Sequence, residues 1–430
     1  MSDEVPPVTA SAKSAPEIGP VRPKERIEVI DILRGFALFG VLAANMLYFS
    51  LPDYLPFAQV WTGTADQAAL WLIEFVVRGK FIRLFSFLFG LGFALQMARA
   101  ESRGVRFFPV YRRRLLVLLL IGLAHALLLL SPGDILHWYV MFGFLLLLFR
   151  ARSPRTLLIA AFICLLIPIA HDAVDIRLHE LRRADPQVAQ EVSRQDAERA
   201  AEDRAGQERQ LRLYSQGTYG EMVADRARWF KEWHSSLRSY SHYLGGAFVM
   251  FLLGLYAGRR RIFENLPVHL PFIRRVLWWG LGLGLVGMSA HVLLDPRYIG
   301  ESADEDLFLA LGRPAMCFFY ASAIILLVQR EAWKKRLAPL AAVGRLALSN
   351  YLLQSLVCTT IFYSYGLGLF GKVGPALGLA LTVLIFALQI LLSVWWLGRF
   401  QFGPMEWLWR SLTYGKRQPL RVQRVVAATR

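Results

Sequence analysis

Residues Tyr111–Gly143 read YRRRLLVLLLIGLAHALLLLSPGDILHWYVMFG, and this stretch decides the fold. Three consecutive arginines open it, and an apolar run leads to His125 before a break at Ser131-Pro132-Gly133. Two apolar helices joined by so short a turn pack as antiparallel neighbours. We therefore expect the arginines to mark one face of a membrane and the Pro-Gly turn to mark the other.

The same stretch places polar groups where a bilayer tolerates few of them. His125 follows Arg114 by about three full helical turns, so both side chains share one stripe near opposite ends of the helix. A neutral histidine is tolerated in a bilayer, whereas a charged one costs several kcal/mol unless it is paired. Asp134 can cap the returning helix at the right depth to pair with His125. We interpret the hairpin as one wall of a polar site inside a membrane protein.

The composition fits a membrane protein. Of the 430 residues 55% are hydrophobic, and the mean hydropathy of +0.40 is too high for an ordinary soluble domain. The formal charge is +17, but the basic residues form short clusters between apolar runs. That pattern is typical of cytoplasmic loops and argues against nucleic-acid binding. No cysteine or histidine spacing indicates a metal site.

We predict an all-α fold, a polytopic membrane helical bundle of about ten transmembrane helices with both termini in the cytoplasm. Every short basic loop then falls on one side of the membrane. Residues 51–79 are amphipathic and are expected at the membrane interface. The predicted parts are a disordered cytoplasmic tail (1–25), a membrane half with helices 1–5 and the site (26–174), a polar periplasmic segment (175–238), a second membrane half with helices 6–10 (239–415) and a basic cytoplasmic tail (416–430).

Several membrane-embedded polar residues have two interpretations. On the first helix, Asp31, Arg34 and Asn45 lie on one face, either as an ion pair with a helix-bonding amide or as a polar stripe along a substrate path. Lys80 and Arg83 precede or open the second helix on the expected outer side, where they either reach lipid phosphates or bind an anionic or carbonyl group.

The remaining candidates are His125, His137 and two amides. His125 is either a structural histidine or a catalytic base partnered by Asp134, and His137 is an alternative base or an interface residue. In GRLALSNYLLQS (344–355), Asn350 precedes Gln354 by four residues, as Tyr351 precedes Ser355. The default interpretation is that these polar residues hold helices together.

Five motifs together resemble the YeiB family of bacterial membrane proteins, whose C-terminal module is catalogued as domain of unknown function 418. The resemblance covers nearly the whole chain outside the tails and residues 175–238, and it implies a multi-pass protein of the bacterial inner membrane. The motifs are RIEVIDILRGFALFGVLAAN (26–45), GKFIRLFSFLFGLGF (79–93), residues 114–135, GRLALSNYLLQS (344–355) and GPMEWLWRSLTYG (403–415).

The N-terminal half also looks like the wider transmembrane acyltransferase superfamily, which includes heparan-α-glucosaminide N-acetyltransferase. This likeness implies transfer of an acyl group from cytoplasmic acetyl-CoA, or another acyl-CoA, to a cell-envelope glycan or lipid. Asp31, Arg34 and Gly35 match the D-x-x-R-G start of the first helix. The heparan enzyme has its catalytic histidine shortly after that helix, whereas this chain has none between Gly35 and Ala124, so His125 would take the role.

Our first hypothesis is therefore a membrane acyltransferase that uses no metal. His125 would deprotonate the acceptor and Asp134 would orient it, while Asn45 with Lys80 or Arg83 would stabilise the oxyanion. The rivals are a transporter or exporter of a small molecule or lipid, without covalent chemistry, and a scaffold for other membrane proteins. The sequence leaves the oligomeric state open, homo-oligomers included. Arg34 and Arg114 would hold the donor phosphates, and Asp31, His137, Asn350 and Gln354 are secondary candidates.

Overall fold

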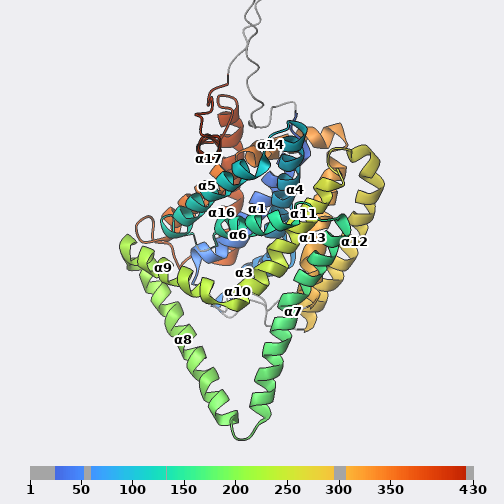
Figure 1. Cartoon of the computed structure of the whole chain (residues 1–430). Coiled ribbons are helices and arrows are strands. Elements are labelled where there is room, and N and C mark those ends of the chain that lie inside the picture. Colours follow the sequence, from blue (N-terminus) through green and yellow to red (C-terminus); the bar gives the residue numbers. More distant parts are fainter. Residues whose placement is uncertain (1–24, 53–59, 132, 295–306, 423–430) are drawn as a thin grey trace, which may run out of the picture.

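The computed structural model describes residues 25–52, 60–131, 133–294 and 307–422 (Figure 1). Within these ranges the regular structure is helical, apart from one isolated β-bridge between Phe400 and Arg421. The all-α architecture agrees with the sequence prediction. Of the two predicted tails, residues 1–24 and 423–430 lie outside the described residues.

Seven helices, or continuous helix pairs, among the described residues are long and apolar enough to cross a membrane. An eighth is formed by α14 (Glu331–Arg345) and α15 (Ala347–Phe362) if this pair, bent by 78°, counts as one span. The seven are α1 (Glu28–Ser50), α3 (Thr64–Leu72) with α4 (Lys80–Ser102), α7 (Pro154–Ala184), α10 (Leu237–Tyr243) with α11 (Val249–Arg259), α12 (Leu266–Leu294), α13 (Leu307–Leu327) and α16 (Pro375–Leu397).

The structure thus offers seven or eight spans rather than about ten. The two predicted spans missing from a count of eight are those of the hairpin of α5 (Phe107–Leu127) and α6 (Leu136–Leu146), and a count of seven also leaves out the bent pair α14–α15. Helix α6 has 11 residues, or about 16 Å at 1.5 Å per residue, roughly half of a bilayer's hydrocarbon core. The start of α5 carries Arg112–Arg114, so this helix is not uniformly apolar. Figure 1 shows both helices running obliquely across the bundle.

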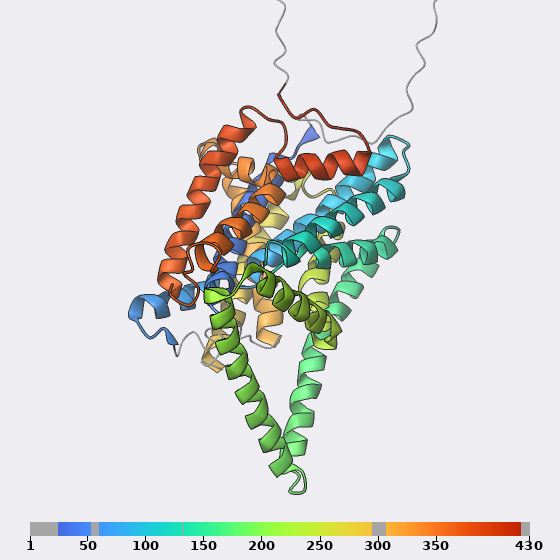
Figure 2. The same cartoon turned by 90° about the vertical axis from the view of Figure 1, so that its left-hand side faces the viewer.

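Two further segments differ from the sequence prediction. Residues 51–79, expected at the membrane interface, contain α3 and a π-helical turn (Ile73–Val77) that belong with α4 to one candidate span. Helix α7 continues past residue 174 and, with α8 (Ala189–Gln216), forms a V-shaped arm that projects from the bundle (Figures 1 and 2). Helix α9 (Tyr219–Ser235) returns to the bundle, where the Tyr219 hydroxyl donates to the carbonyl of Leu128 at 2.6 Å.

The basic loops gather at the opposite end from this arm, near α14 and α17 (Pro404–Tyr414; Figure 1). Arg103, after α4, pairs with Glu25 at 3.0 Å, and Lys334 of α14 pairs with Glu28 of α1 at 3.6 Å. Arg259, at the end of α11, donates to the carbonyl of Arg152 in the loop before α7. Basic loops far apart in the chain therefore lie together at one end of the bundle.

The outer surface of the bundle is apolar. Many large hydrophobic side chains of α7, α12 and α16 are exposed, which is unusual for a soluble protein and expected where lipid covers the helices. Examples are Ile159, Phe162 and Ile163 on α7, Trp278, Trp279 and Val286 on α12, and Leu388 and Leu391 on α16.

Close contact between α1 and α14 explains why the first-helix motif has a glycine at position 35. A Cβ atom at Gly35 would collide with the carbonyl oxygen of Leu340, and one at Gly344 would collide with the carbonyl oxygen of Asp31. Small residues of this kind let helix backbones approach each other in membrane proteins. Gly35 therefore sets the position of Asp31, one turn before it, and of the adjacent Arg34 relative to α14.

Candidate functional site

The His125 imidazole lies in the last turn of α5, next to the loop of the hairpin, and is fully buried. Its Nδ1 atom is 2.7 Å from Oδ1 of Asp134, and the other carboxylate oxygen is 2.6 Å from Nδ1 of His137. Asp134 also accepts the backbone N–H of His137 at 3.3 Å, which caps the start of α6. Because an ionised carboxylate can only accept hydrogen bonds, both imidazoles carry a proton on Nδ1. Asp134 is thus held by three donors.

The other ring nitrogen of His125 faces α15. Its Nε2 atom is 2.7 Å from Oγ of Ser355, a residue 1% exposed. With the proton of neutral His125 on Nδ1, Nε2 accepts the proton of the Ser355 hydroxyl. The result is an ordered Ser–His–Asp relay, the geometry by which a histidine takes a proton from a hydroxyl while a carboxylate holds the ring.

The chain reaches this geometry through a tight turn and close helix packing. Leu130 adopts a left-handed backbone conformation with φ of 53°, which turns the chain after α5. A Cβ atom at Gly122 would lie 2.9 Å from the Cβ of Leu136, so α5 and α6 approach closely just before His125. Asn45 of α1 also borders the turn, because a Cβ at Gly133 would lie 3.3 Å from its Oδ1 atom.

A cavity of about 320 Å³ extends into the bundle from its basic end. Three acidic residues, Glu25, Asp31 and Glu406, also line it. We call its charged outer part the arginine rim, which consists of Arg26, Arg34, Arg99, Arg103, Arg114, Arg345 and Arg410. Further in, the walls are apolar and include Leu38, Val41, Phe85, Phe89 and Leu118.

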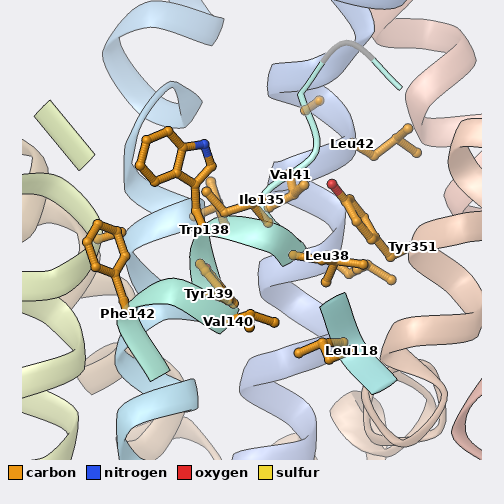
Figure 3. Close-up of a cluster of buried hydrophobic side chains, with 14 of the residues drawn as sticks. Leu38, Val41, Leu42, Leu118, Ile135, Trp138, Tyr139, Val140, Phe142 and Tyr351 are labelled. Carbon is orange, nitrogen blue, oxygen red and sulfur yellow. The ribbon is translucent and has the colours of Figure 1, made fainter. Parts of the chain in front are cut away.

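Tyr351 stands at the inner end of the cavity, together with Ile135 and Leu136, the N-terminal residues of α6. Figure 3 shows its ring beside Leu38 and across from Ile135. The Tyr351 hydroxyl donates to the carbonyl of Gly133 at 3.2 Å, and its ring centroid lies 4.7 Å from that of His125. Tyr351 therefore contacts the cavity and the relay together and forms the partition between them.

The rim brings together the two arginines that the sequence proposed for phosphate binding. Arg34 pairs with Asp31 at 2.5 Å. The Arg114 guanidinium stacks 3.8 Å from the ring centroid of Trp409, and Trp409 Nε1 donates to the Arg114 carbonyl at 2.9 Å. Helix α17 thus covers the rim. Burial and the neighbouring charge of Arg114 lower the pKa of Arg410 to about 10.

Glu406 fastens α17 to the start of α15. Its carboxylate accepts the backbone N–H groups of Leu348 and Ser349 at 2.7 and 3.1 Å, and the Ser349 hydroxyl at 2.5 Å. Burial raises the pKa of this carboxyl despite these donors. The GPMEWLWRSLTYG motif therefore docks α17 over the rim through its glutamate.

Lys80 and Arg83 lie in a different cluster from His125. The Lys80 ammonium donates to the backbone carbonyl of Glu74 at 2.6 Å, and Arg83 donates to the carbonyl of Gly79 at 2.9 Å. The Glu74 carboxylate also pairs with Arg78 at 3.0 Å and with Arg313 at 3.5 Å. The four cations are thus gathered around the π-helical turn between α3 and α4.

Asn350 and Gln354 join α15 to α16. Asn350 Nδ2 donates to the Ser393 hydroxyl at 2.9 Å, and Gln354 Nε2 donates to Oε1 of Gln389 at 2.9 Å. These bonds hold the helix that carries Tyr351 and Ser355 against the bundle.

Sequence reasoning missed Ser355 as a partner of His125, because 230 residues separate the two and only the spacing from Tyr351 to Ser355 singled it out. It also missed the full arginine rim. Among the described residues, no group of three or more His, Cys, Asp or Glu side chains is placed to hold a metal ion. The cysteines Cys164, Cys317 and Cys358 are free thiols.

The chain is thus an all-helical protein with several apolar helices of membrane-spanning length and a buried polar relay. A family model described as "Protein of unknown function (DUF418)" matches residues 257–416. The chain is 39% identical over 413 residues to the uncharacterized protein YxaH of Bacillus subtilis, covering 93% of this chain and 97% of that one. It is 30% identical over 407 residues to the uncharacterized protein YeiB of Escherichia coli, covering 90% and 96% of the two chains.

The chain therefore belongs to the DUF418 family, and the resemblance seen in the sequence motifs is confirmed. A third relative, an uncharacterized 39.9 kDa protein of Bacillus acidopullulyticus, is 28% identical over 422 residues, covering 93% of this chain and 97% of the relative. These relatives are all bacterial, which agrees with a bacterial multi-pass membrane protein.

Proposed function

We propose that this protein is a membrane-embedded acyltransferase that moves an acyl group from a cytoplasmic acyl-CoA, such as acetyl-CoA, to a hydroxyl or amine of a cell-envelope glycan or lipid. The observation that carries this proposal is the buried His125–Asp134 pair, which lies behind Tyr351 at the inner end of a cavity with an arginine rim. A histidine that is paired with a carboxylate can act as a general base, and the arginine rim can bind the phosphates of coenzyme A.

The donor fits the two halves of the cavity. Seven arginines against three acidic residues give the rim an excess of positive charge, and arginine binds phosphate through a bidentate fork. A volume of about 320 Å³ is at the lower end of ligand pockets. It suits the pantetheine arm with a short acyl group, while the nucleotide stays at the rim. The apolar walls would then direct the thioester toward Tyr351.

The relay would supply the chemistry. His125 Nε2 accepts a proton, and Asp134 holds the ring and stabilises the imidazolium that forms, a contribution of about 10²–10⁴-fold. Asn45, which borders the turn before α6, would stabilise an oxyanion. Because Lys80 donates to the carbonyl of Glu74 and Arg83 to that of Gly79, we do not assign them the oxyanion role.

A topology follows from the same placement. Eight spans, with the α5–α6 hairpin entering and leaving on one side, keep both termini in the cytoplasm, where the basic loops belong. The arm of α7 and α8 then lies in the periplasm, and the protein lies in the bacterial inner membrane. Helix α9 reaches the hairpin from the arm side, since the His137 ring is 5.0 Å from that of Phe230. The acceptor would approach there.

The test uses the purified full chain in detergent, with acetyl-CoA as donor and hydroxylamine as a small surrogate acceptor. Wild type should release coenzyme A, and His125→Ala should lose this activity while it still binds acetyl-CoA. A matched control is His242→Ala, because His242 also pairs with a buried aspartate, Asp172, at 2.8 Å. Solute movement in proteoliposomes without any donor, and no release of coenzyme A, would instead indicate a transporter.

A further inference from the structure

Three buried groups from separate parts of the chain are aligned for nucleophilic chemistry. Ser355 comes from α15, His125 from α5 and Asp134 from the turn before α6. Both hydrogen-bond distances in the relay are 2.7 Å, and each of the three residues is at most 5% exposed. A nucleophile and a base within hydrogen-bond reach, with a third group orienting the base, are the signature of an activated hydroxyl.

The direction of the Ser355 side chain is informative. Hydroxyls within helices often donate to the backbone carbonyl one turn earlier. Thr360 and Thr382 do so here, with distances of 2.7 and 3.0 Å to the carbonyls of Leu356 and Gly378. The Ser355 hydroxyl is directed instead to Nε2 of His125. Because that nitrogen is fully buried and already contacts a hydroxyl, the first proton it can take is that of Ser355.

The size and the opening of the cavity also favour a nucleophilic role for Ser355. A cavity of about 320 Å³ suits one donor arm and leaves little room for an acceptor beside it. The donor cavity opens at the basic end, whereas α9 contacts the hairpin from the opposite end. A reaction in which both substrates meet would require simultaneous access. A covalent intermediate removes that requirement.

We propose that Ser355 is the nucleophile of a two-step transfer and holds the acyl group as an ester on its Oγ atom; this rests on the proposed acyltransferase function. In the first step Oγ bonds to the thioester carbonyl carbon and the carbon–sulfur bond breaks. The Ser355 proton passes to His125 Nε2 and then to the leaving thiolate, which departs as coenzyme A. In the second step the acceptor oxygen or nitrogen bonds to the ester carbonyl carbon and the bond from that carbon to Ser355 Oγ breaks. The acceptor proton passes to His125 Nε2 and then to Ser355 Oγ, which restores the hydroxyl.

Tyr351 controls access to this serine. It lies one turn before Ser355 on α15, lines the cavity and contacts the His125 ring. Its ring must move aside for a thioester to reach Oγ. Its hydroxyl also holds the carbonyl of Gly133, next to Asp134, so the partition is bonded to the turn that orients the base.

The experiment has one arm that needs no acyl donor. Purified full-length protein is incubated with diisopropyl fluorophosphate, which phosphorylates activated serines, and the modified peptide is identified by mass spectrometry. We expect modification of Ser355 in wild type, faster modification in Tyr351→Ala, and loss of it in Ser355→Ala and His125→Ala. Ser322→Ala, which removes another buried serine, serves as the control and should label as wild type does.

The second arm uses acetyl-CoA alone, followed by an acid quench. Wild type should carry acetate on the peptide that contains Ser355, and Ser355→Ala should carry none and lose at least about 100-fold in release of coenzyme A. Ser355→Cys keeps a nucleophile at this position and should form a thioester that hydroxylamine cleaves. Thermal unfolding in detergent checks that each variant is folded.

The outcomes separate the two proposals. If wild type releases coenzyme A, and folded Ser355→Ala does so at the same rate without an acylated peptide, Ser355 is not the nucleophile and the acyltransferase function stands. If neither wild type nor any variant uses acyl-CoA, the proposed function fails. The fluorophosphate experiment then still tests whether Ser355 is an activated nucleophile. Absence of label on Ser355 in both wild type and Tyr351→Ala would overturn its assignment.

Discussion

His125 and Asp134 should behave as one unit in catalysis, and a double-mutant cycle can test this. The changes are His125→Ala, Asp134→Asn and the pair of them together. Asp134 accepts imidazole N–H groups on both oxygens, at 2.7 and 2.6 Å. An asparagine has only one acceptor oxygen, so one of the two histidines must turn its ring or change tautomer. The wrong tautomer at His125 removes the base.

The magnitude follows from the role of the base. Loss of a general base, or of the carboxylate that orients it, lowers turnover by on the order of 10²–10⁴-fold, or about 3–5.5 kcal/mol of activation free energy. If the two residues act together, the double variant should lose no more than either single variant. Independent roles would instead multiply the losses to on the order of 10⁴–10⁸-fold.

The assay measures the cycle twice, once by release of coenzyme A and once by thermal unfolding in detergent. His125→Ala should also cost about 2–4 kcal/mol in unfolding free energy, because it leaves a cavity and removes a hydrogen bond to a buried carboxylate. The same cycle on His242 and Asp172 is the control and should leave turnover unchanged. Turnover losses that multiply, or full activity in His125→Ala, would refute the reasoning.

The remaining predictions concern the rim, the topology and the packing. Arg34→Lys and Arg114→Lys should weaken acetyl-CoA binding measured by titration calorimetry, because a lysine cannot form the bidentate fork. Arg177→Lys in the arm is the control. Unchanged affinity in both rim variants would show that neither arginine belongs to the donor site. Topology can be tested with single cysteines in a protein without its native cysteines. Cysteines that replace Arg103 and Lys334 should not react with an impermeant thiol reagent in intact cells, whereas one that replaces Ala200 should react. Labelling of the cysteine at position 103 would contradict the topology. Gly35→Ala and Gly344→Ala should lower the unfolding free energy by about 1–3 kcal/mol, because the added methyl groups overpack the α1–α14 contact. Gly282→Ala is the control, since a Cβ atom there meets no neighbouring atom within 4 Å. Equal thermal midpoints for all three variants would refute the close α1–α14 contact. Because burial raises the pKa of Glu406, the folded protein binds the carboxyl proton more tightly than the unfolded chain does. The unfolding free energy should therefore fall as pH rises above the ordinary glutamate range. Glu406→Gln should remove that part of the pH dependence, and identical pH profiles of wild type and Glu406→Gln would contradict this prediction.

Properties that depend on residues near one another in the chain could be predicted from the sequence. The apolar runs, the basic loops and the motifs that resemble the DUF418 family are such properties. The pairing of His125 with Asp134 also belongs here, because nine residues and one tight turn separate them, and local geometry leaves few alternatives. The hairpin's depth was harder to predict, since an apolar run of membrane-spanning length became a helix of 11 residues.

Contacts between distant segments were decided by the tertiary structure. The arginine rim draws on α1, α4, α5, α14 and α17, and no spacing along the chain indicates that Arg34, Arg345 and Arg410 line one cavity. The approach of α13 brings Arg313 beside Arg83 at Gly79 and into an ion pair with Glu74, whose carbonyl Lys80 contacts, and no spacing along the chain indicates this cluster. Ser355 is the clearest case: its four-residue spacing from Tyr351 places both on one helix face, but only the packing of α15 against α5 brings that face to His125. The physical reason is that the pattern of one helix determines which face is buried, whereas helix crossings determine which faces meet.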